Sequence, residues 1–366
     1  MAVLLGVDTG GTYTDAVLVE DDKTVLASAK SLTTRSDLAQ GIGASVAAVI
    51  DRAGVDPASI AMAALSTTLA TNALVEGHGG RVALVYIGFN RKDLATHGLT
   101  DALAGDPLIV LEGGHTHAGV EAAPLDGVAL SDWLAGLVGV SAFAVASQFG
   151  TRNPAHELKA AEIIRAATGA PVSCSHHLSA KLNGPKRALT ALLNARLIGM
   201  IDRLIGRAQD ALIASGVNAP LMVVRGDGAL ISAAMARERP IETILSGPAA
   251  SIVGARWLTG AEHALVSDIG GTTTDIAVLR DGRPTIDPAG AQVGPYRTMV
   301  EAVAMRTSGL GGDSEVHFIA EGLKSGVTLG PRRVLPVSLL AVEASDIVHA
   351  TLERQLGNPI SAEYDG

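Results

Sequence analysis

One short segment of this chain occurs twice, in register and without a gap. Val7–Leu18, which reads VDTGGTYTDAVL, aligns with Ser267–Val278, which reads SDIGGTTTDIAV. Asp8 corresponds to Asp268, so the two copies lie 260 residues apart, and each is flanked by apolar runs typical of strands. Because the 366 residues exceed what one hydrophobic core usually supports, the repeat indicates two similar lobes.

Each copy predicts a β-hairpin whose glycine-rich turn binds phosphate. Glycine permits positive φ and leaves no Cβ to obstruct a ligand, and the N–H groups of such a turn can converge on phosphate oxygens. An aspartate beside a phosphate needs a cation between the two charges, so Asp8 and Asp268 predict a Mg²⁺ site. They are also the candidate catalytic groups that orient or deprotonate a nucleophile. The predicted nucleotide-binding residues of the two turns are Thr9, Gly10, Gly11, Thr12, Thr14, Gly270, Gly271, Thr272 and Thr273.

Two other phosphate-binding loops are excluded by what the turns lack. No Gly-Lys-Ser/Thr follows the glycines, as a Walker loop requires, and no G-x-G-x-x-G follows the first strand, as a dinucleotide fingerprint requires. A duplicated hairpin that serves folding alone is the alternative. The net charge of −9 argues against a general nucleic-acid binder, whose affinity depends on cationic side chains.

The composition also indicates where such a protein works. Its one cysteine, Cys174, excludes an intrachain disulfide and is compatible with a reducing compartment. No apolar run approaches the roughly 20 residues of a membrane helix, and the N-terminus shows no cleavable leader. A cytoplasmic protein that does not contact a membrane is therefore expected.

Apolar periodicity and turn residues predict the remaining elements. Residues 4–29 are a predicted β-meander, and 81–89, 221–224 and 264–267 are predicted strands. The predicted helices are 38–54, 66–76, 154–169, 187–215, 249–258 and 339–356.

Two phosphate loops on similar lobes resemble the superfamily of acetate and sugar kinases, Hsp70 and actin. The resemblance implies an α/β fold of duplicated actin-like (ribonuclease H-like) ATPase lobes with a central nucleotide cleft. Residues 1–185 are the predicted N-terminal lobe and residues 186–366 the predicted second lobe. In this superfamily a later glycine loop contacts the nucleotide base, and here the best match is Ser308–Ser314, with Gly311 and Gly312 as the candidate contacts.

A closer resemblance, over nearly the whole chain, is to the hydantoinase/oxoprolinase A family. The matching stretches are GGTYTDAVL (10–18), STTLATNALVEGHGGRVALV (66–85), NPAHE (153–157), RALTALLNARL (187–197), RGDGALIS (225–232), ETILSGPAASIVGA (242–255) and SDIGGTTTDIAV (267–278). The resemblance implies ATP and Mg²⁺ as cofactors. It also implies hydrolysis of a cyclic amide such as a hydantoin or 5-oxoproline, or carboxylation of a ketone. A B-type partner subunit commonly accompanies such chains, and self-association is left open.

The chain departs from the family pattern in two places. The glycine run near the adenosine loop is interrupted by Asp313, which could hydrogen-bond a ribose or weaken nucleotide binding. Members of the family are also commonly longer, so a C-terminal region that contributes to substrate binding or subunit contact is expected to be missing.

Small polar residues at the start of the predicted helix 66–76 are the candidate substrate contacts. Thr67, Thr68 and Asn72 could line the substrate side of the cleft together with helix-terminal N–H groups. Ordinary helix capping is the alternative.

Two histidine pairs are candidate halves of a metal site, with an exposed loop or a structural role as the alternative. His115 and His117 would face the same side of a strand, whereas His176 and His177 would point apart on one.

Three functions compete on this evidence. The first is an ATP-dependent hydrolase subunit that phosphorylates the carbonyl oxygen of a cyclic amide. The second is a small-molecule kinase or ketone carboxylase subunit of the same superfamily. The third is a nucleotide-gated binding or assembly module without a small substrate. The family-like segments between the two turns favour the first.

Overall fold

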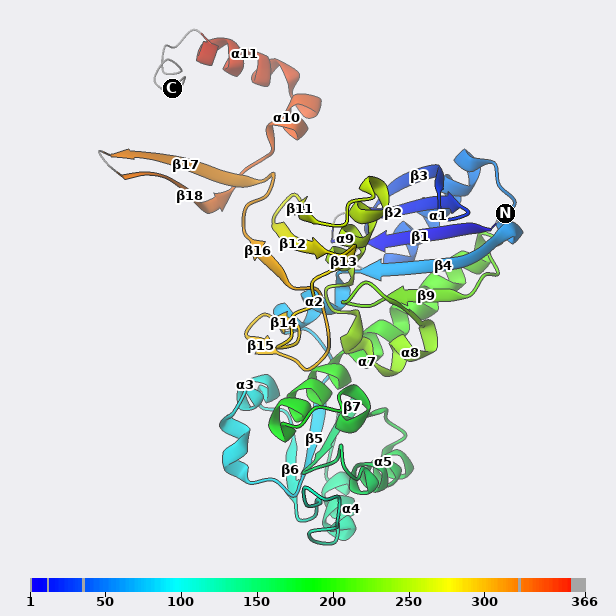
Figure 1. Ribbon diagram of the computed structural model, residues 1–366, viewed down its shortest axis with the longest axis vertical. Helices are drawn as coiled ribbons and strands as arrows, with labels where there is room; N and C mark the ends of the chain where they lie inside the picture. Colours follow the sequence, from blue (N-terminus) through cyan, green and yellow to red (C-terminus); the bar gives the residue numbers. More distant parts are fainter. Residues whose placement is uncertain (1, 12, 35–36, 322–323, 357–366) are drawn as a thin grey trace. The chain divides into compact units, whose positions relative to one another are not determined.

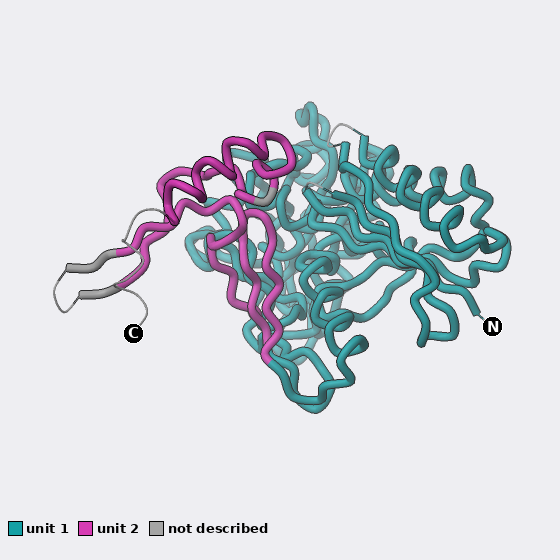
Figure 2. The backbone as a smooth tube through the Cα atoms, turned by 90° about the horizontal axis from the view of Figure 1, so that it is seen from above, with its two compact units in different colours: residues 1–264, 278–304 teal, residues 265–277, 305–366 magenta. Residues whose placement is uncertain are grey.

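The computed structural model describes residues 2–11, 13–34, 37–321 and 324–356. The chain divides into two compact units, shown in Figure 2. Unit 1 comprises residues 1–264 and 278–304, and unit 2 comprises residues 265–277 and 305–366.

A six-stranded sheet with the strand order β10-β9-β4-β1-β2-β3 forms the first layer of unit 1 (Figure 1). β1 pairs in parallel with β4 and β4 with β9, whereas β2 and β3 continue from β1 as an antiparallel meander. The predicted meander is thus confirmed. The strands are β1 (Val3–Thr9), β2 (Tyr13–Glu20), β3 (Thr24–Leu32), β4 (Ile60–Thr67), β9 (Leu221–Val224) and β10 (Leu230–Ser232).

Alternation of side chains decides which face of this sheet is buried. Val3, Leu5 and Val7 point into the main core, where they join α1 (Leu38–Ala53) and α7 (Gly184–Ala214). Asp37 caps α1 by accepting from the N–H of Ala39, and Gly54 ends the helix in the left-handed conformation. The intervening residues, Asp8 among them, face the opposite side of the sheet.

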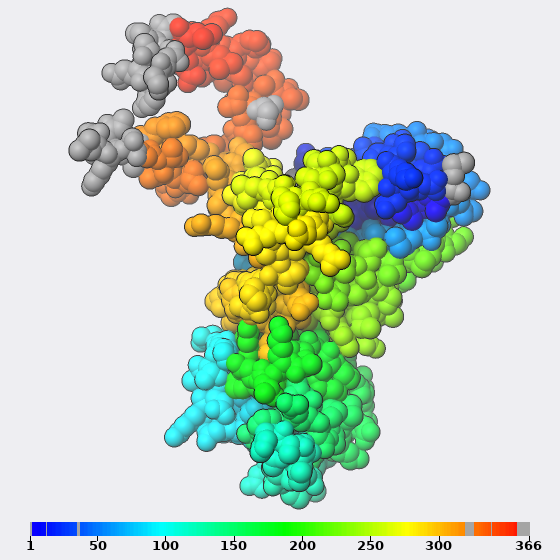
Figure 3. All heavy atoms as spheres, in the orientation of Figure 1, coloured from blue at the N-terminus to red at the C-terminus, as the bar shows by residue number. Residues whose placement is uncertain are grey.

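A second sheet, β6-β5-β7-β8, is parallel throughout and lies within residues 82–174 of unit 1. These residues appear in cyan to green in Figures 1 and 3. Every residue of β5 and of β7 is buried, as expected for strands covered on both faces. Alternate residues pack against α7 on one face and against α4 and α5 on the other. The elements are β5 (Val82–Ile87), β6 (Leu108–Leu111), β7 (Ala142–Ser147), β8 (Val172–Cys174), α4 (Gly127–Ala135) and α5 (Ala155–Thr168).

The remaining elements of unit 1 are short, apart from α9, which packs against β4 and β9. They are η1 (Pro57–Ser59), α2 (Leu69–Val75), η2 (Arg91–Ala95), α3 (Leu99–Leu103), α6 (Ser175–Leu178), α8 (Ala233–Glu238), η3 (Pro240–Thr243), α9 (Ser246–Thr259), β13 (Arg283–Pro284), β14 (Gln292–Val293) and β15 (Tyr296–Arg297).

Unit 2 contains the second copy of the repeat. β12 (Thr274–Arg280) lies beside β11 (Ala264–Ile269) and pairs antiparallel with β16 (Met305–Ser308). A two-stranded hairpin, β17–β18, and two helices follow. These later elements are β17 (Ser314–Glu321), β18 (Lys324–Arg333), α10 (Val337–Glu343) and α11 (Ser345–Leu356). Among the described residues, no helix is long and apolar enough to cross a membrane.

Two predicted helices need correction. Ser66 and Thr67 end strand β4 instead of opening a helix, because they pair in parallel with the end of β1, and the helix begins only at Leu69. The predicted helix 339–356 is two helices, α10 and α11, which are separated at Ala344.

Candidate functional site

The two copies of the repeat fold into turns with the same internal hydrogen bond. In the first, the N–H of Gly10 donates to the carbonyl of Tyr13 at 3.0 Å, and in the second the N–H of Gly270 donates to the carbonyl of Thr273 at 2.8 Å. The donor and the acceptor are equivalent positions of the repeat. The sequence duplication is therefore a duplication of backbone geometry.

The glycines serve these turns for a different reason from the one expected. None of Gly10, Gly11, Gly270 and Gly271 has positive φ, so the expectation based on backbone freedom is wrong. A Cβ on Gly10 would lie 3.1 Å from the carbonyl oxygen that its own N–H contacts, and the corresponding distance at Gly270 is 3.3 Å. A Cβ on Gly11 or Gly271 would meet nothing within 4 Å, so at these two positions the missing side chain leaves open space in which a ligand can approach the backbone.

Asp8 lies at the end of β1, where a second strand end and a helix N-terminus meet it. Ser66 is its parallel neighbour on β4, and the Ser66 hydroxyl donates to Asp8 Oδ1 at 2.5 Å. Gly247, in the first turn of α9, is close enough that a Cβ there would lie 3.8 Å from the same oxygen. The positive end of the α9 dipole therefore points toward a carboxylate, which favours anions at this place.

Ser246 fixes α9 to the end of β4. Its hydroxyl donates to the carbonyl of Thr67 at 2.9 Å and lies 3.2 Å from the Thr67 N–H. The N–H of Leu245, a residue with φ of 60°, donates to the Thr71 hydroxyl at 2.9 Å. Side chains of α2 and backbone of β4 thus hold the helix start, and the helix start in turn adjoins Asp8.

The three predicted substrate contacts lie beside this junction but differ in access. Thr67 is buried, and its hydroxyl accepts from the N–H of Leu69 at 3.1 Å. Thr68 is half-buried and Asn72 is exposed, with the Asn72 amide 3.4 Å from the Thr68 hydroxyl. Of the three side chains, those of Thr68 and Asn72 are the accessible ones.

The predicted threonines of the first hairpin face the interior. Thr9 and Thr14 are opposite each other in the β1–β2 pair and are both buried. The Thr14 hydroxyl lies 3.0 Å from that of Thr33, and the Thr9 hydroxyl has no hydrogen-bond partner in the structure. Thr12 lies outside the described residues.

A cavity of about 340 Å³ opens beside the first hairpin. Asp8, Asp15 and Ser66 line its polar part, and Ala64 and Ala250 line its apolar part. Lys30 lies 3.0 Å from Asp15 and neutralises that carboxylate. The cavity thus joins one buried hydroxyl and two acidic groups to a surface of small residues.

In unit 2, the predicted adenosine loop lies directly on the second hairpin. The N–H of Gly312 donates to the carbonyl of Gly270 at 3.1 Å, and that of Asp313 donates to the carbonyl of Gly271 at 2.8 Å. Gly311 packs so closely that a Cβ there would lie 2.5 Å from the carbonyl carbon of Thr272. Here glycine is required by a close approach of two backbones, which ties the loop to the phosphate turn.

Asp313, which interrupts the glycine run, is held by an arginine. Arg333 Nη1 lies 2.8 Å from Asp313 Oδ1 and also donates to the carbonyl of Thr272 at 2.9 Å. The aspartate therefore helps to tie β18 to the loop and to the second hairpin.

The acidic residues of the hairpins fit a divalent cation. Burial raises the pKa of Asp275, the neighbouring Asp268 carboxylate raises it further, and a hydrogen bond from Thr307 opposes this. Asp268 itself is exposed. Carboxylate oxygens are ligands that Mg²⁺ takes, and Asp268 offers accessible ones. Asp8 offers a similar donor next to the cavity.

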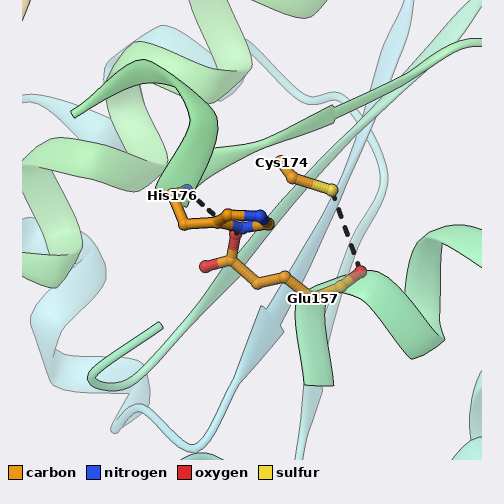
Figure 4. A group of neighbouring side chains, drawn as sticks. All are labelled: Glu157, Cys174 and His176. Carbon is orange, nitrogen blue, oxygen red and sulfur yellow. Dashed lines mark hydrogen bonds and ion pairs between the residues drawn. The ribbon is translucent and has the colours of Figure 1, made fainter. Parts of the chain in front are cut away.

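A separate cluster surrounds Glu157 at the carboxyl end of the parallel sheet (Figure 4). Glu157 is fully buried, and it accepts from the N–H of Ser147 at 2.8 Å, from the Ser175 hydroxyl at 2.7 Å and from the N–H of His176 at 3.0 Å. His176 Nδ1 lies 2.7 Å from Glu157 Oε2. Burial alone raises the pKa of Glu157, but the hydrogen bonds from His176 and Ser175 outweigh it and hold the pKa below its usual range.

Glu157, Cys174 and His176 bring potential metal-ligand atoms within 4.8 Å of one another, but their chemistry is that of a hydrogen-bonded network. Both carboxylate oxygens of Glu157 already accept from buried donors. Burial raises the pKa of the Cys174 thiol to about 12. The Cys174 thiol lies 3.8 Å from the Glu157 carbonyl (Figure 4).

The histidine pairs are not arranged as the sequence suggested. His176 and His177 lie on the short helix α6 with ring centroids 4.1 Å apart, so they do not point apart on a strand. His115 is buried, whereas His117 is exposed, which separates the two imidazoles that a shared site would need. His115 lies instead against His156, with ring centroids 4.5 Å apart.

His156 lies in the first turn of α5, within the predicted helix 154–169, and it also hydrogen-bonds to the loop after β6. The N–H of Gly114 donates to His156 Nδ1 at 2.9 Å, so this nitrogen carries a lone pair. Nε2 therefore holds the proton that is donated to Glu121 Oε1 at 2.9 Å. This geometry describes a neutral structural histidine.

Sequence reasoning missed two contacts of the site, for a common reason. The Ser66–Asp8 bond follows from the parallel register of β1 and β4, and the approach of Gly247 to Asp8 follows from the position of α9. Both are long-range pairings. A usable signal was present, because Asp8 and Ser66 each end an apolar run, and parallel strands end at the same edge.

Comparison with known proteins agrees with this architecture. The family model described as "Hydantoinase/oxoprolinase N-terminal region" matches residues 4–168, and the one described as "Hydantoinase/oxoprolinase" matches residues 187–338. The caprolactamase subunit alpha of Pseudomonas jessenii is 28% identical over 354 residues, which cover 90% of this chain and 50% of that protein. The acetophenone carboxylase gamma subunit of Aromatoleum aromaticum aligns with this chain over 373 positions, gaps included, at 28% identity. The alignment covers 90% of this chain and 49% of that protein.

Solved structures give the same result for the fold. The crystal structure of the ATP-dependent caprolactamase from Pseudomonas jessenii matches with a TM-score of 0.74 at 28% identity, over 90% of this chain and 51% of that one. A nucleotide-free acetone carboxylase structure also has a TM-score of 0.74, at 22% identity, and supports the fold alone.

These matches confirm the predicted fold class, an α/β fold with actin-like ATPase-type lobes. The chain spans about half the length of the curated relatives it matches, and these relatives are named as subunits. The division into lobes at residue 185 stays a prediction. The matching family models together show that the chain belongs to the hydantoinase/oxoprolinase family.

Proposed function

We propose that the chain is the nucleotide-binding part of an ATP-dependent enzyme that opens a cyclic amide by phosphorylating its carbonyl oxygen. The observation that carries this proposal is the duplicated turn. Asp8 precedes one turn and Asp268 the other, both turns close with the same hydrogen bond, and both leave open space at the second glycine. The relatives named as an ATP-dependent caprolactamase support the choice of a cyclic amide.

The proposed reaction is a phosphoryl transfer followed by two hydrolytic steps. The amide carbonyl oxygen attacks the γ-phosphorus of ATP, the bond to the β-phosphate oxygen breaks, and ADP leaves. Water adds to the activated carbon and the C–N bond breaks, so that the ring nitrogen leaves with a proton and an acyl phosphate remains. A second water then releases inorganic phosphate and the carboxylate. Positioning and charge neutralisation are the tasks left to the protein in such a phosphoryl transfer.

The residues of this chain have distinct tasks in the proposal. Asp8, fixed by the Ser66 hydroxyl, orients the nucleophile at the cavity beside the first hairpin, and Thr68 and Asn72 contact the substrate at the neighbouring helix start. The turns at Gly10–Gly11 and Gly270–Gly271 hold the phosphates. Asp8 and Asp268 would hold Mg²⁺, which neutralises phosphate charge when bound.

The proposal also includes a partner subunit of the B type, because the relatives are named as subunits. The test is therefore run on the chain alone and with its partner. Phosphate release is measured with a panel of hydantoins, 5-oxoproline, lactams and ketones. We expect cyclic amides to stimulate ATP hydrolysis and to be opened. A stable phosphorylated product without ring opening would contradict the proposed hydrolase and favour a small-molecule kinase.

A second candidate is activation of a ketone for carboxylation, which the acetophenone carboxylase relative favours. The same carbonyl phosphorylation would serve it, with bicarbonate as the second reactant. In the panel this function gives bicarbonate-dependent ATP hydrolysis with ketones and none with lactams. ATP hydrolysis that no small molecule stimulates would contradict both functions and favour a nucleotide-gated module.

A further inference from the structure

Unit 1 contains a pocket that none of the residues of the two glycine hairpins lines. It measures about 290 Å³ and lies against β8, between the end of α5 and the segment that follows α8. Arg165, Arg237 and Arg239 line it, together with one carboxylate among the described lining residues, that of Glu238. We propose that this pocket binds a small oxyanion, a carboxylate or phosphate group carried on a short apolar body.

The three arginines are not equally neutralised. Arg237 is held by Asp202, whose Oδ1 lies 2.8 Å from Arg237 Nε, and by Gln209. The guanidinium group of Arg165 is exposed and makes no hydrogen bond or ion pair with any described residue, so it is available to a ligand. The guanidinium groups of Arg165 and Arg239 are therefore less well paired than that of Arg237.

Arg239 is underpaired in a partly buried position. Its nearest carboxylate is that of Glu242, 3.5 Å from Arg239 Nη1, and Glu242 is shared with Arg225 at 3.6 Å. Arg239 Nε is buried and has no hydrogen-bond partner among the described residues. A buried donor left unpaired is costly, and planar oxyanions pair with guanidinium groups in a bidentate manner. An oxyanion in the pocket would supply an acceptor for Arg239.

The rest of the lining is also suited to an oxyanion with an apolar body. β8 is an edge strand that pairs with β7 alone in its sheet, so backbone groups on its outer side are not used by the sheet. Leu178 and Ile198 line the pocket with apolar surface. The volume lies near the lower end of the range for small-molecule sites, which limits the ligand to a small one.

His177 completes the lining, and the Glu157 network holds it in place. Glu157 fixes His176 (Figure 4), and the His176 ring lies against that of His177. Burial lowers the pKa of His177, and the cationic forms of His176 and Arg239 lower it further. A bound anion would act in the opposite direction and raise this pKa. The charged groups that act on His177 from the surrounding elements are His176, Arg239, Glu157 and Glu238.

The test measures binding of inorganic phosphate and of butyrate to the full chain by calorimetry, with Arg165→Gln and Arg239→Gln as the variants. Arg91→Gln is the matched control, since Arg91 is an exposed arginine outside this pocket. We expect at least one of the two anions to bind, and each pocket variant to weaken it at least about tenfold, with the control unchanged. The anion that binds identifies the source of the oxyanion group.

A second readout needs no arginine variant. In the wild-type chain, the NMR titration of His177, assigned with His177→Gln, should move to a higher pKa when the anion is added. Absence of binding, binding that neither arginine variant weakens, or an unchanged His177 titration at saturating anion would each overturn the proposal. ATP hydrolysis is not a readout here, so a result that overturns this anion site would leave the proposed function untested, and the reverse also holds.

Discussion

Replacing Glu157 by glutamine tests the buried network that supports the parallel sheet. The substitution keeps the size of the side chain but turns one acceptor oxygen into a donor NH₂. Glu157 accepts from Ser147 and Ser175 at one oxygen and from the N–H of His176 at the other. In either amide orientation, at least one buried N–H then faces another donor and loses its acceptor.

The expected loss of stability follows from the hydrogen bonds that the substitution removes. A hydrogen bond to a charged group contributes about 1.5–3 kcal/mol, and a buried donor left unsatisfied costs about 1–3 kcal/mol. Arg187, which is 1% exposed and interacts electrostatically with Glu157, would also lose its neighbouring negative charge. Allowing for relaxation, we expect Glu157→Gln to lower the free energy of unfolding by about 2–4 kcal/mol, or the Tm by roughly 3–5 °C.

The pH dependence gives the sharper test. The folded-state pKa of Glu157 is lowered, so its contribution to stability is present above the unfolded-state pKa and is lost as the pH falls through the folded value. Urea unfolding from pH 7 to pH 3 should therefore show the gap between wild type and variant narrowing below a pH of about 4.3. A gap that stays constant across this range, or no destabilisation at pH 7, would refute the reasoning.

Three further substitutions and one labelling experiment address the site. Gly271→Ala should change the Tm by no more than about 1 °C, since the new Cβ meets nothing within 4 Å. The same substitution should weaken ATP binding at least about tenfold. An unchanged ATP affinity would contradict the proposed role of this turn in binding phosphate. Gly311→Ala, whose Cβ would lie 2.5 Å from hairpin backbone, should cost about 1–3 kcal/mol and speed hydrogen exchange in the second turn, and unaltered exchange argues against that contact. Ser66→Ala removes a hydrogen bond to Asp8 and should lower kcat for ATP hydrolysis about tenfold, with a smaller effect on KM. A change in KM alone would exclude a role of Ser66 in positioning Asp8. Cys174, whose thiol pKa is about 12 because of burial, should resist alkylation at pH 8 until the chain unfolds, and rapid labelling of the native chain would show that the thiol is accessible.

Local sequence patterns were sufficient where neighbouring residues determine the structure. The meander β1–β3 and helix α7 follow from apolar periodicity and turn residues, and the equivalence of the two hairpins follows from the repeat itself. The repeat, with its two copies 260 residues apart, indicated two similar lobes, and the actin-like fold class was implied by the superfamily that the two loops resemble. These features depend on residues that are close in the chain or identical in pattern.

Long-range pairing explains what the sequence did not show. Ser66 and Thr67 read as a helix start, but the parallel pairing with β1 draws them into a strand. The reason for glycine in the phosphate turns was also missed, since contact distances rather than φ require it at Gly10. The arginine pocket beside β8 is built from residues of five separate elements, so no local motif could have revealed it.

The central claim is that each hairpin binds phosphate, and equilibrium binding of ATP with Mg²⁺ to the full chain tests it most directly. We expect Asp8→Ala and Asp268→Ala each to weaken binding at least about tenfold and to lower ATP hydrolysis at least ~100-fold, because each aspartate is proposed to position the nucleotide and to neutralise its charge. Lys30→Ala, which removes the ion pair with Asp15 and the cation over the Tyr13 ring, should have a much smaller effect. Binding and turnover close to wild type in either aspartate variant would contradict the two-hairpin account.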